Sequence, residues 1–342
     1  MTLFCIFAEI FSLHNTMDIQ KHLFETVKKK IAKRDSLTSV IEDLLGVSSD
    51  SAYRRISGKT EITFSELQKI CGKFNISMDE ILNYKSNQGA LFQYGPLVLS
   101  DQESSINQLE RILKILDGLK SASEKEILYL AMDVPYYHFA KFPDLAFFRQ
   151  YVWYDSMNRS QISYNEFCRQ LDKEKMISIF EKFHNTMMFI PVKEVWTDQT
   201  IDPILRLLEH YYETGAFESK DTVLSLLDQL NSVFDMLKQY AEDGHKGGER
   251  KTPYFQYLSY VDLESGIMLL RKDDQLLCSI RLNTINSIST DNDAICTRLQ
   301  KWMDNIIYKS VQISSISVME RTRFYRTSKN KIDALREKIK SN

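Results

Sequence analysis

Apolar residues three and four positions apart recur from about residue 19 onward and predict a series of short helices. The first is expected over 19–33. Its buried stripe is formed by residues four apart: Leu23, Val27 and Ile31. A second helix is expected between Ser36, which suits an N-cap, and Gly46, which tolerates a left-handed backbone. Ser48 or Ser49 is then expected to cap the start of a third helix.

Two later helix starts carry capping boxes, Thr63-Phe-Ser-Glu66 and Ser77-Met-Asp-Glu80. In each box a hydroxyl and a carboxylate satisfy otherwise free backbone N–H groups. The pattern therefore predicts five compact helices within 17–85. Apolar side chains of the last two helices are expected to complete one small core: Phe64, Leu67, Ile70, Cys71, Phe74, Ile76, Ile81 and Leu82.

The stretch Asp43-Leu-Leu-Gly-Val-Ser-Ser-Asp-Ser-Ala-Tyr-Arg-Arg-Ile-Ser-Gly58 joins an apolar helix, a glycine turn and a polar, cationic helix. This is the layout of a helix-turn-helix DNA reader. The residues resemble the phage-repressor (Cro-type, xenobiotic-response-element) family of bacterial regulators from about Leu23 to Leu82. The resemblance implies a compact DNA-binding domain in which helix 48–57 enters the major groove.

The first turn of such a helix lies nearest the base edges. The outward residues expected to face bases are Ser49, Asp50, Ser51, Tyr53 and Arg54. Asp50 can accept from cytosine and Arg54 can donate to guanine. Three residues at the helix end and in the next loop are expected to contact phosphates instead: Arg55, Ser57 and Lys59. Many relatives carry Gln or Arg where this chain has small or acidic residues, so the bases that it reads stay open.

Residues 101–342 show a mixture of helical and strand patterns. Helices are expected over ranges with apolar stripes: 101–120, 172–187, 199–215, 219–242 and 291–309. Glu126–Met132 is expected to be a buried strand. Three more strands are expected at 254–262, 266–272 and 275–283, joined by short turns that favour an antiparallel meander. Residues 243–253 are expected to form an exposed loop between helix and meander.

Asp133–Trp153 is unusually rich in aromatic side chains. It resembles a segment of uncharacterised bacterial one-component regulators that join this type of reader to a large C-terminal domain of unknown ligand. Such aromatic side chains either line a ligand pocket or simply form core. The candidate pocket wall consists of Tyr136, Tyr137, His138, Phe142 and Trp153. For His138 a structural role is favoured over a catalytic or metal-binding one.

Charge and cysteine content limit the kind of nucleic-acid contact and the cellular compartment that we expect. The formal net charge is -2, so any contact with nucleic acid must be local. Residues 17–85 contain twelve Lys and Arg against ten acids, and 86–342 contain thirty-two against thirty-five. The five cysteines are scattered, with no Cys-x-x-Cys pair, and indicate a reduced cytoplasmic setting without a metal site.

The two ends of the chain leave alternatives open. Residues 1–16 are apolar but lack the basic start and cleavage site of a signal peptide. They are either a non-native or disordered extension before a start at Met17 or a translated segment. Residues 320–342 hold eight Lys and Arg against three acids and predict a solvated terminal helix. The alternative is a second DNA-facing or dimer-stabilising element.

The sequence as a whole predicts an α+β protein: an all-helical DNA-binding domain at 17–85, a linker at 86–100, and a mainly helical regulatory or dimerisation domain with a small antiparallel sheet at 101–342. We expect a cytoplasmic transcriptional regulator that binds double-stranded DNA as a homodimer and responds to a small-molecule or peptide effector. No membrane partner and no cofactor are expected. No local catalytic motif is present, so we expect no enzymatic activity. The competing hypothesis is a protein-interaction or antitoxin-like module without operator binding.

Overall fold

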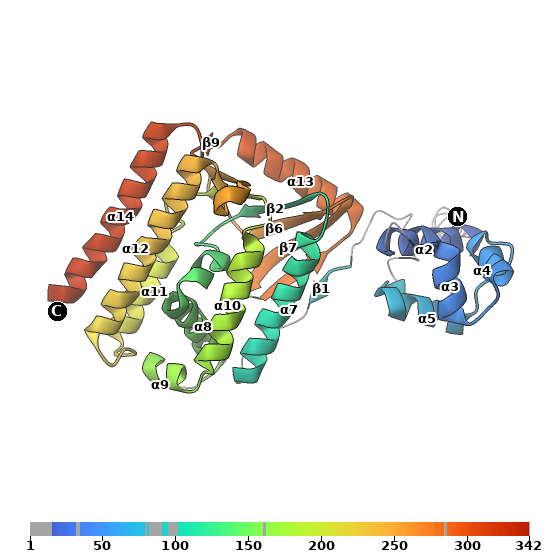
Figure 1. Ribbon diagram of the computed structural model, residues 1–342, viewed down its shortest axis with the longest axis horizontal. Helices are drawn as coiled ribbons and strands as arrows, with labels where there is room; N and C mark the ends of the chain where they lie inside the picture. The colour runs from blue at the N-terminus through green and yellow to red at the C-terminus, as the bar shows by residue number, and fades with distance from the viewer. Residues whose placement is uncertain are drawn as a thin grey trace, which may run out of the picture. The chain divides into compact units, whose positions relative to one another are not determined.

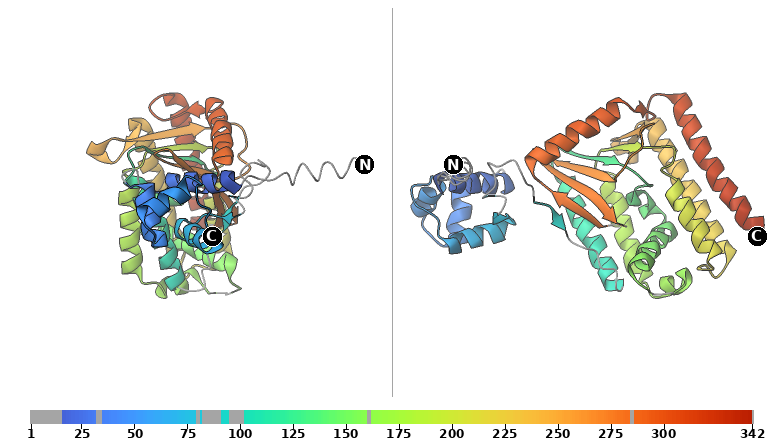
Figure 2. Two further views of the ribbon diagram at one scale, coloured as in Figure 1. Left: turned by 90° about the vertical axis from the view of Figure 1, so that its right-hand side faces the viewer. Right: turned by 180° about the vertical axis from the view of Figure 1, so that it is seen from behind.

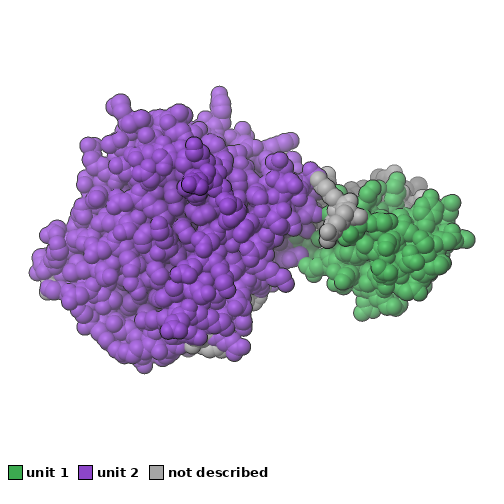
Figure 3. All heavy atoms as spheres, in the orientation of Figure 1, with its two compact units in different colours: residues 1–91 green, residues 92–342 purple. Residues whose placement is uncertain are grey.

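The computed structural model describes residues 16–31, 35–78, 81, 91–94, 102–159, 162–283 and 286–341. The chain divides into two compact units, residues 1–91 and 92–342 (Figure 3). Each unit has its own hydrophobic core.

Unit 1 is helical (Figure 1). Its described helices are α2 (Thr16–Lys30), α3 (Leu37–Leu45), α4 (Ser49–Ile56) and α5 (Phe64–Phe74). The first helix ends at Lys30, earlier than expected, and Lys33 lies outside the described residues. The box predicted at Ser77 also includes residues outside the described part, namely Asp79 and Glu80.

Local capping signals account for most of these helix ends. Gly46 adopts a left-handed conformation (φ 67°) and donates its N–H to the Glu42 carbonyl, which ends α3 as predicted. The Ser48 hydroxyl accepts from the Ser51 N–H and caps α4. Thr63 and Glu66 form the complete capping box at the start of α5. Ser36 precedes α3 in an extended conformation, but its hydroxyl makes no capping hydrogen bond.

The core of unit 1 is built from the helical stripes. Its fully buried members are Leu23, Phe24, Val27, Ile41, Ala52, Ile70, Cys71, Ile76 and Ile81. Phe64 is 73% exposed, so the prediction that it belongs to this core is wrong. It is the first residue of α5, and its position there turns the side chain outward while Thr63 and Glu66 fix the backbone. Leu82 lies outside the described residues.

Unit 2 contains a mixed sheet rather than the small antiparallel sheet that the sequence predicted. Its nine described strands are β1 (Gln93–Tyr94), β2 (Lys125–Leu130), β3 (Val192–Trp196), β4 (His245–Lys246), β5 (Thr252–Leu258), β6 (Ile267–Lys272), β7 (Gln275–Asn283), β8 (Asn286–Thr290) and β9 (Val311–Gln312). They follow the order β1-β8-β7-β6-β2-β3-β5-β4, with β9 paired to β5. β2, β3 and β5 are parallel. The expected antiparallel meander is confirmed for β6 and β7. It is wrong for β5, which pairs with β3, β4 and β9 and not with β6.

Helices cover both faces of this sheet (Figures 1 and 2). One face packs against α7 (Gln102–Lys120), α8 (Pro143–Met157), α10 (Lys173–Met187), α12 (Lys220–Asp243) and α14 (Val318–Ser341). Also in this layer are the 3₁₀ helix η1 (Tyr136–Lys141), α9 (Tyr164–Arg169) and α11 (Asp202–Glu213), while η2 (Gly248–Arg250) precedes β5. α13 (Asp293–Tyr308) covers the other face, as predicted. Along β2, Ile127 and Tyr129 join the first core and Leu128 and Leu130 the second, because strand side chains alternate.

Two predictions about exposed segments need correction. The stretch 243–253 is not simply an exposed loop, because it contains β4 and buries Lys246 and Thr252. The terminal helix α14 is not solvated all round, since it packs one side into the main core of unit 2. That side carries Phe324, Tyr325, Ile332, Leu335 and Ile339.

None of the described helices combines the length and the apolar character that crossing a bilayer requires.

Candidate nucleic-acid interface and a buried polar centre

The outward face of α4 is polar and open. Ala52 is fully buried beneath the helix. The opposite side of α4 exposes Ser49, Asp50, Tyr53 and Arg54, and Ser51 is half-buried. The amphipathic spacing predicted this division, because residues three and four apart share one helical face. The N-terminus of α4 also adds partial positive charge where its first turn is exposed.

Lys59 extends the polar face beyond the end of α4. Its Nζ lies 6.0 Å from the centre of the Tyr53 ring. Ser57 is exposed, and its hydroxyl donates to the Arg54 carbonyl at 3.2 Å. Arg54 directly follows Tyr53 in the sequence, and Arg54 and Lys59 are both exposed. The polar face therefore carries two exposed cations. Phosphates and base edges are the acceptors that such donors recognise in DNA.

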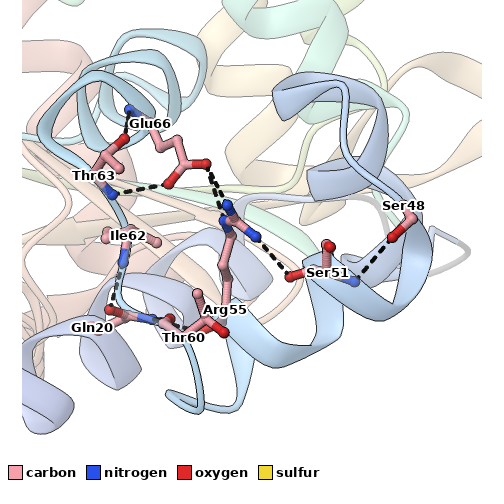
Figure 4. Close-up of polar contacts among 8 residues, drawn as sticks. All are labelled: Gln20, Ser48, Ser51, Arg55, Thr60, Ile62, Thr63 and Glu66. Atoms are coloured by element: carbon pink, nitrogen blue, oxygen red, sulfur yellow. Dashed lines mark hydrogen bonds and ion pairs between the residues drawn. The ribbon is translucent and has the colours of Figure 1, made fainter.

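Arg55 differs from Arg54 because its guanidinium is engaged inside the domain (Figure 4). Its Nε and Nη2 lie 3.0 Å and 2.9 Å from Glu66 Oε1. Nη1 donates to the Ser51 carbonyl at 3.2 Å. The side chain expected to contact phosphate therefore holds α4 against the start of α5.

Gln20 positions the loop after α4, a role that sequence reasoning missed. Its buried side-chain amide donates to the carbonyls of Arg55 and Thr60 at 2.7 Å and 2.8 Å. Its carbonyl oxygen accepts from the Ile62 N–H at 3.1 Å (Figure 4). The three bonds tie both ends of the segment that carries Lys59. A glutamine in the helical pattern of 19–33 gives no sign of contacts some forty residues away.

These features define a helix-turn-helix module: α3, a glycine turn, and α4 with an exposed polar face. Residues 18–102 match the BetR domain, a family of helix-turn-helix-like DNA-binding domains. The match supports a DNA-binding regulatory role at the level of that family. No curated protein and no solved structure matches the chain.

The predicted aromatic wall in unit 2 divides into two groups. Tyr137 and His138 are buried and point to Glu194, while the Tyr136 and Trp153 rings pack at a tilt of 54° with their centres 4.8 Å apart. Phe142 is half-buried against the main core. Most of this aromatic density is therefore core, with polar groups placed within it.

Glu194 on β3 is the centre of the first group and is fully buried. Its Oε1 accepts from the Tyr137 hydroxyl and, at 2.8 Å, from His138 Nε2. Its Oε2 accepts from Trp196 Nε1 at 2.8 Å and from the Tyr254 hydroxyl at 3.0 Å. His138 is thus hydrogen-bonded within the core, and the structural role favoured from the sequence stays a prediction. Glu194 follows Lys193 in the short segment 192–196, and this pattern gave no sign of a buried polar centre.

The electrostatics keep Glu194 ionised despite its burial. Burial alone would raise the pKa of this carboxyl, but His138 and the donated hydrogen bonds hold it below its ordinary value. Burial and the adjacent carboxylate raise the pKa of Tyr137 and Tyr254 well above the ordinary range. Lys246 is also buried nearby, and burial lowers its pKa to about 7 although Glu194 opposes the shift. This centre is a connected polar network within the core.

Among the residues that the structure describes, no group of three or more His, Cys, Asp or Glu side chains is arranged to hold a metal ion. The described cysteines Cys71, Cys168, Cys278 and Cys296 are buried free thiols.

Proposed function

We propose that the chain is a cytoplasmic one-component transcriptional regulator that reads double-stranded DNA with α4 and the loop after it. The observation that carries the proposal is the exposed row of Ser49, Asp50, Tyr53 and Arg54 on a helix whose other side is buried. The BetR match supports it at the level of family. In this mechanism the first turn of α4 enters the major groove, Arg54 contacts a base edge, and Lys59 contacts a phosphate.

The proposal includes a homodimer, because two linked readers bind two half-sites about one helical turn apart. A surface of unit 2 supports it. We name it the β9 surface; it consists of exposed apolar residues from three segments that meet around β9: Tyr260, Val261, Tyr308, Ile316, Val318 and Met319. Large apolar side chains exposed together in one part of a fold are typical of an interaction site.

A second copy of the chain suits the β9 surface best. The Tyr260 hydroxyl donates to Glu320 at 3.1 Å and accepts from Arg323 at 2.8 Å, so one acid and one base adjoin the apolar residues. A face with both charges can match itself across a two-fold axis. DNA would be repelled by Glu320 and gain little from the apolar side chains.

The test is to sequence genomic DNA fragments retained by the purified chain and to measure binding to the enriched duplex against a scrambled one. We expect a common motif with two half-sites and binding that weakens steeply with salt. Retention of random fragments only, or none at about 0.15 M salt, would refute an operator-binding role.

The alternative is a module that docks on another protein. A hollow of about 220 Å³ in unit 1 favours it, lined by Ile19, Gln20, Leu23, Glu61, Ile62, Leu67, Met78 and Ile81. This hypothesis predicts a co-purifying polypeptide and no DNA retention. Catalysis is not part of the proposal, and unit 2 is assigned a regulatory and dimerising role.

A further inference from the structure

Asp133 lies just beyond the carboxyl end of β2, where two arginines from distant parts of unit 2 converge on it. Arg149 of α8 donates from Nη2 to Asp133 Oδ2 at 3.1 Å, and Arg281 of β7 donates from Nη1 to Oδ1 at 2.7 Å. β2 runs parallel to β3. The crevice outside the carboxyl ends of parallel strands is where open α/β sheets commonly bind ligands.

The charges of this group do not balance. Two guanidinium groups face one carboxylate, which leaves a net positive charge beside a buried surface. Arg149 is 7% exposed and Arg281 has a quarter of its side chain open to solvent. Burial lowers the pKa of Arg149, Asp133 opposes that shift, and Arg281 adds to it. An additional anion would relieve the repulsion between the two arginines.

Arg149 also has an unused donor. Across the described ranges, only two buried side-chain nitrogen or oxygen atoms have no hydrogen-bond partner, and Arg149 Nε is one of them. An unsatisfied buried N–H costs about 1–3 kcal/mol. The other is Gln256 Nε2, on the β5 residue that pairs with Glu194 in the sheet. Arg149 Nε thus identifies a place where an acceptor is missing.

An aromatic floor lies beside this cation. The Arg149 guanidinium carbon is 5.5 Å from the centre of the Trp153 ring, and Trp153 packs against Tyr136 with the two rings tilted. Gln150 donates to the Tyr136 hydroxyl at 3.1 Å and holds that ring in place. Trp153 packs with Tyr136 and Met157 in a small cluster, which Tyr136 joins to the main core. Trp153 of the predicted ligand pocket therefore adjoins Arg149, and Tyr136 adjoins Trp153.

We propose that Arg149 and Arg281 bind the carboxylate of a small organic acid, whose apolar body lies against Trp153 and Tyr136. Arg149 supplies its Nε–H as one donor. Arg281 supplies those N–H groups of its guanidinium that do not bind Asp133. A single negative charge neutralises the group, whereas a phosphate dianion would reverse its sign inside a poorly hydrated site. A monocarboxylate is therefore preferred to phosphate.

The sheet links this site to the strand that follows the reader. Arg281 lies at an irregularity between β7 and β8, where Arg281 pairs with Ser287 and Asn283 with Asn286. β8 in turn pairs with β1, at Ser289 and Ile288. Bulges of this kind re-aim side chains next to functional sites. A role of the acid as effector of DNA binding rests on the proposed function; binding of the acid does not.

The experiment uses the full chain, without DNA, and sodium benzoate as the probe. Tryptophan fluorescence is titrated at constant ionic strength, with sodium phosphate and sodium chloride in parallel. We expect a saturable change with benzoate, weaker by at least ten-fold in Arg281→Gln and in Arg149→Lys, which keeps the charge but loses Nε–H. Arg250→Gln, an exposed arginine 3.5 Å from the Phe189 ring, is the matched control and should bind as the original chain does.

Thermal unfolding confirms that each variant is folded. Three results would overturn the proposal: no saturable response to benzoate, unchanged binding in the folded Arg281→Gln variant, or phosphate binding as tight as benzoate. A chain that binds benzoate but no DNA would refute the proposed function and leave the acid site standing.

Discussion

Arg55 and Glu66 join the candidate recognition helix to the start of the next helix through an ion pair with Nη2 and Oε1 2.9 Å apart. Glu66 has a second duty, because its Oε2 accepts from the Thr63 N–H at 2.9 Å in the capping box. One carboxylate therefore fixes both the orientation of α4 and the first turn of α5. Both side chains of the pair are mostly buried, so the contact is less screened than a surface salt bridge.

Glu66→Gln should destabilise unit 1 and weaken DNA binding without touching DNA. Removing the charge weakens the Arg55 contact and the capping box, and we expect a loss of about 1–2 kcal/mol in the free energy of unfolding. Urea denaturation of Glu66→Gln, Arg55→Ala and the double variant should give a coupling energy of about 1 kcal/mol. Strictly additive losses would show that the pair contributes nothing.

The same pair predicts a pH dependence. Burial raises the pKa of Glu66, but the Thr63 N–H and Arg55 outweigh it and hold the pKa below its ordinary value near 4.5. Its stabilising contribution is therefore present above pH 4.5 and is lost as the pH falls through the folded-state pKa. The stability difference between the original chain and Glu66→Gln should shrink below that pH.

Arg54→Ala and Lys59→Ala should affect DNA binding in different ways. Loss of a base contact at Arg54 costs about 1–3 kcal/mol on the cognate duplex and little on random DNA. Loss of a phosphate contact at Lys59 weakens binding to all sequences and reduces the slope of log K against log salt by about 1. Fluorescence anisotropy at several salt concentrations separates them, with the exposed Lys69→Ala on α5 as control. Equal loss on cognate and random duplex for Arg54→Ala would remove its base-reading role.

The sequence predicted unit 1 well because its signals are local. Gly46, Ser48 and the Thr63–Glu66 box each act within four residues, and the buried stripe follows helical spacing. The contacts of Gln20 and Arg55 were missed for the opposite reason. The partners of Gln20 lie thirty-five to forty-two residues away, and Glu66 lies eleven residues from Arg55, so no local pattern encodes these contacts.

The sheet of unit 2 was predicted only in part. Strand positions at 126–132, 266–272 and 275–283 were close to those found, because apolar alternation is visible along the chain. The pairing of β5 with β3 was not, since parallel neighbours are joined by crossovers whose order the pattern leaves open. Val192–Trp196 has only five residues, and Lys193 and Glu194 interrupt its apolar character. The buried network on Glu194 depends on this strand, so it could not be predicted either.

Glu194→Gln should be among the most destabilising conservative changes in unit 2. An amide cannot accept the four hydrogen bonds that the carboxylate receives, and about 2–4 kcal/mol should be lost from the free energy of unfolding. Tyr254→Phe removes one donor and should cost about 1.5–3 kcal/mol. Tyr240→Phe is the matched control, because the Tyr240 hydroxyl contacts only the Met188 sulfur at 3.7 Å among the bonds to the described chain. Equal losses for the two tyrosine variants in urea denaturation would contradict this network.

Lys246 should make the stability of unit 2 rise with pH above neutrality. Burial lowers its pKa to about 7 in the folded chain, against an ordinary value of 10.5. Between these values the unfolded chain binds the extra proton, so stability gains at most about 1.4 kcal/mol per pH unit from this group. Lys246→Met should remove that slope in urea denaturation at pH 7, 8 and 9. The exposed Lys251→Met should keep it, and parallel curves for the original chain and Lys246→Met would exclude the assignment.

The β9 surface should hold two copies of the chain together. Tyr308 and Met319 are 89% and 85% exposed, more than the other large apolar side chains described. Burying such side chains contributes about 1.5–3 kcal/mol each. Tyr308→Ser with Met319→Ser should therefore convert a dimer to a monomer at micromolar concentration, as measured by sedimentation velocity. Leu282→Ser, an equally drastic change at an exposed residue of β7, should stay dimeric.

On a two-half-site operator the monomeric variant should bind each half independently and more weakly, because the linked second contact is lost. If the double variant sediments as the original chain does, the β9 surface is not a dimer interface.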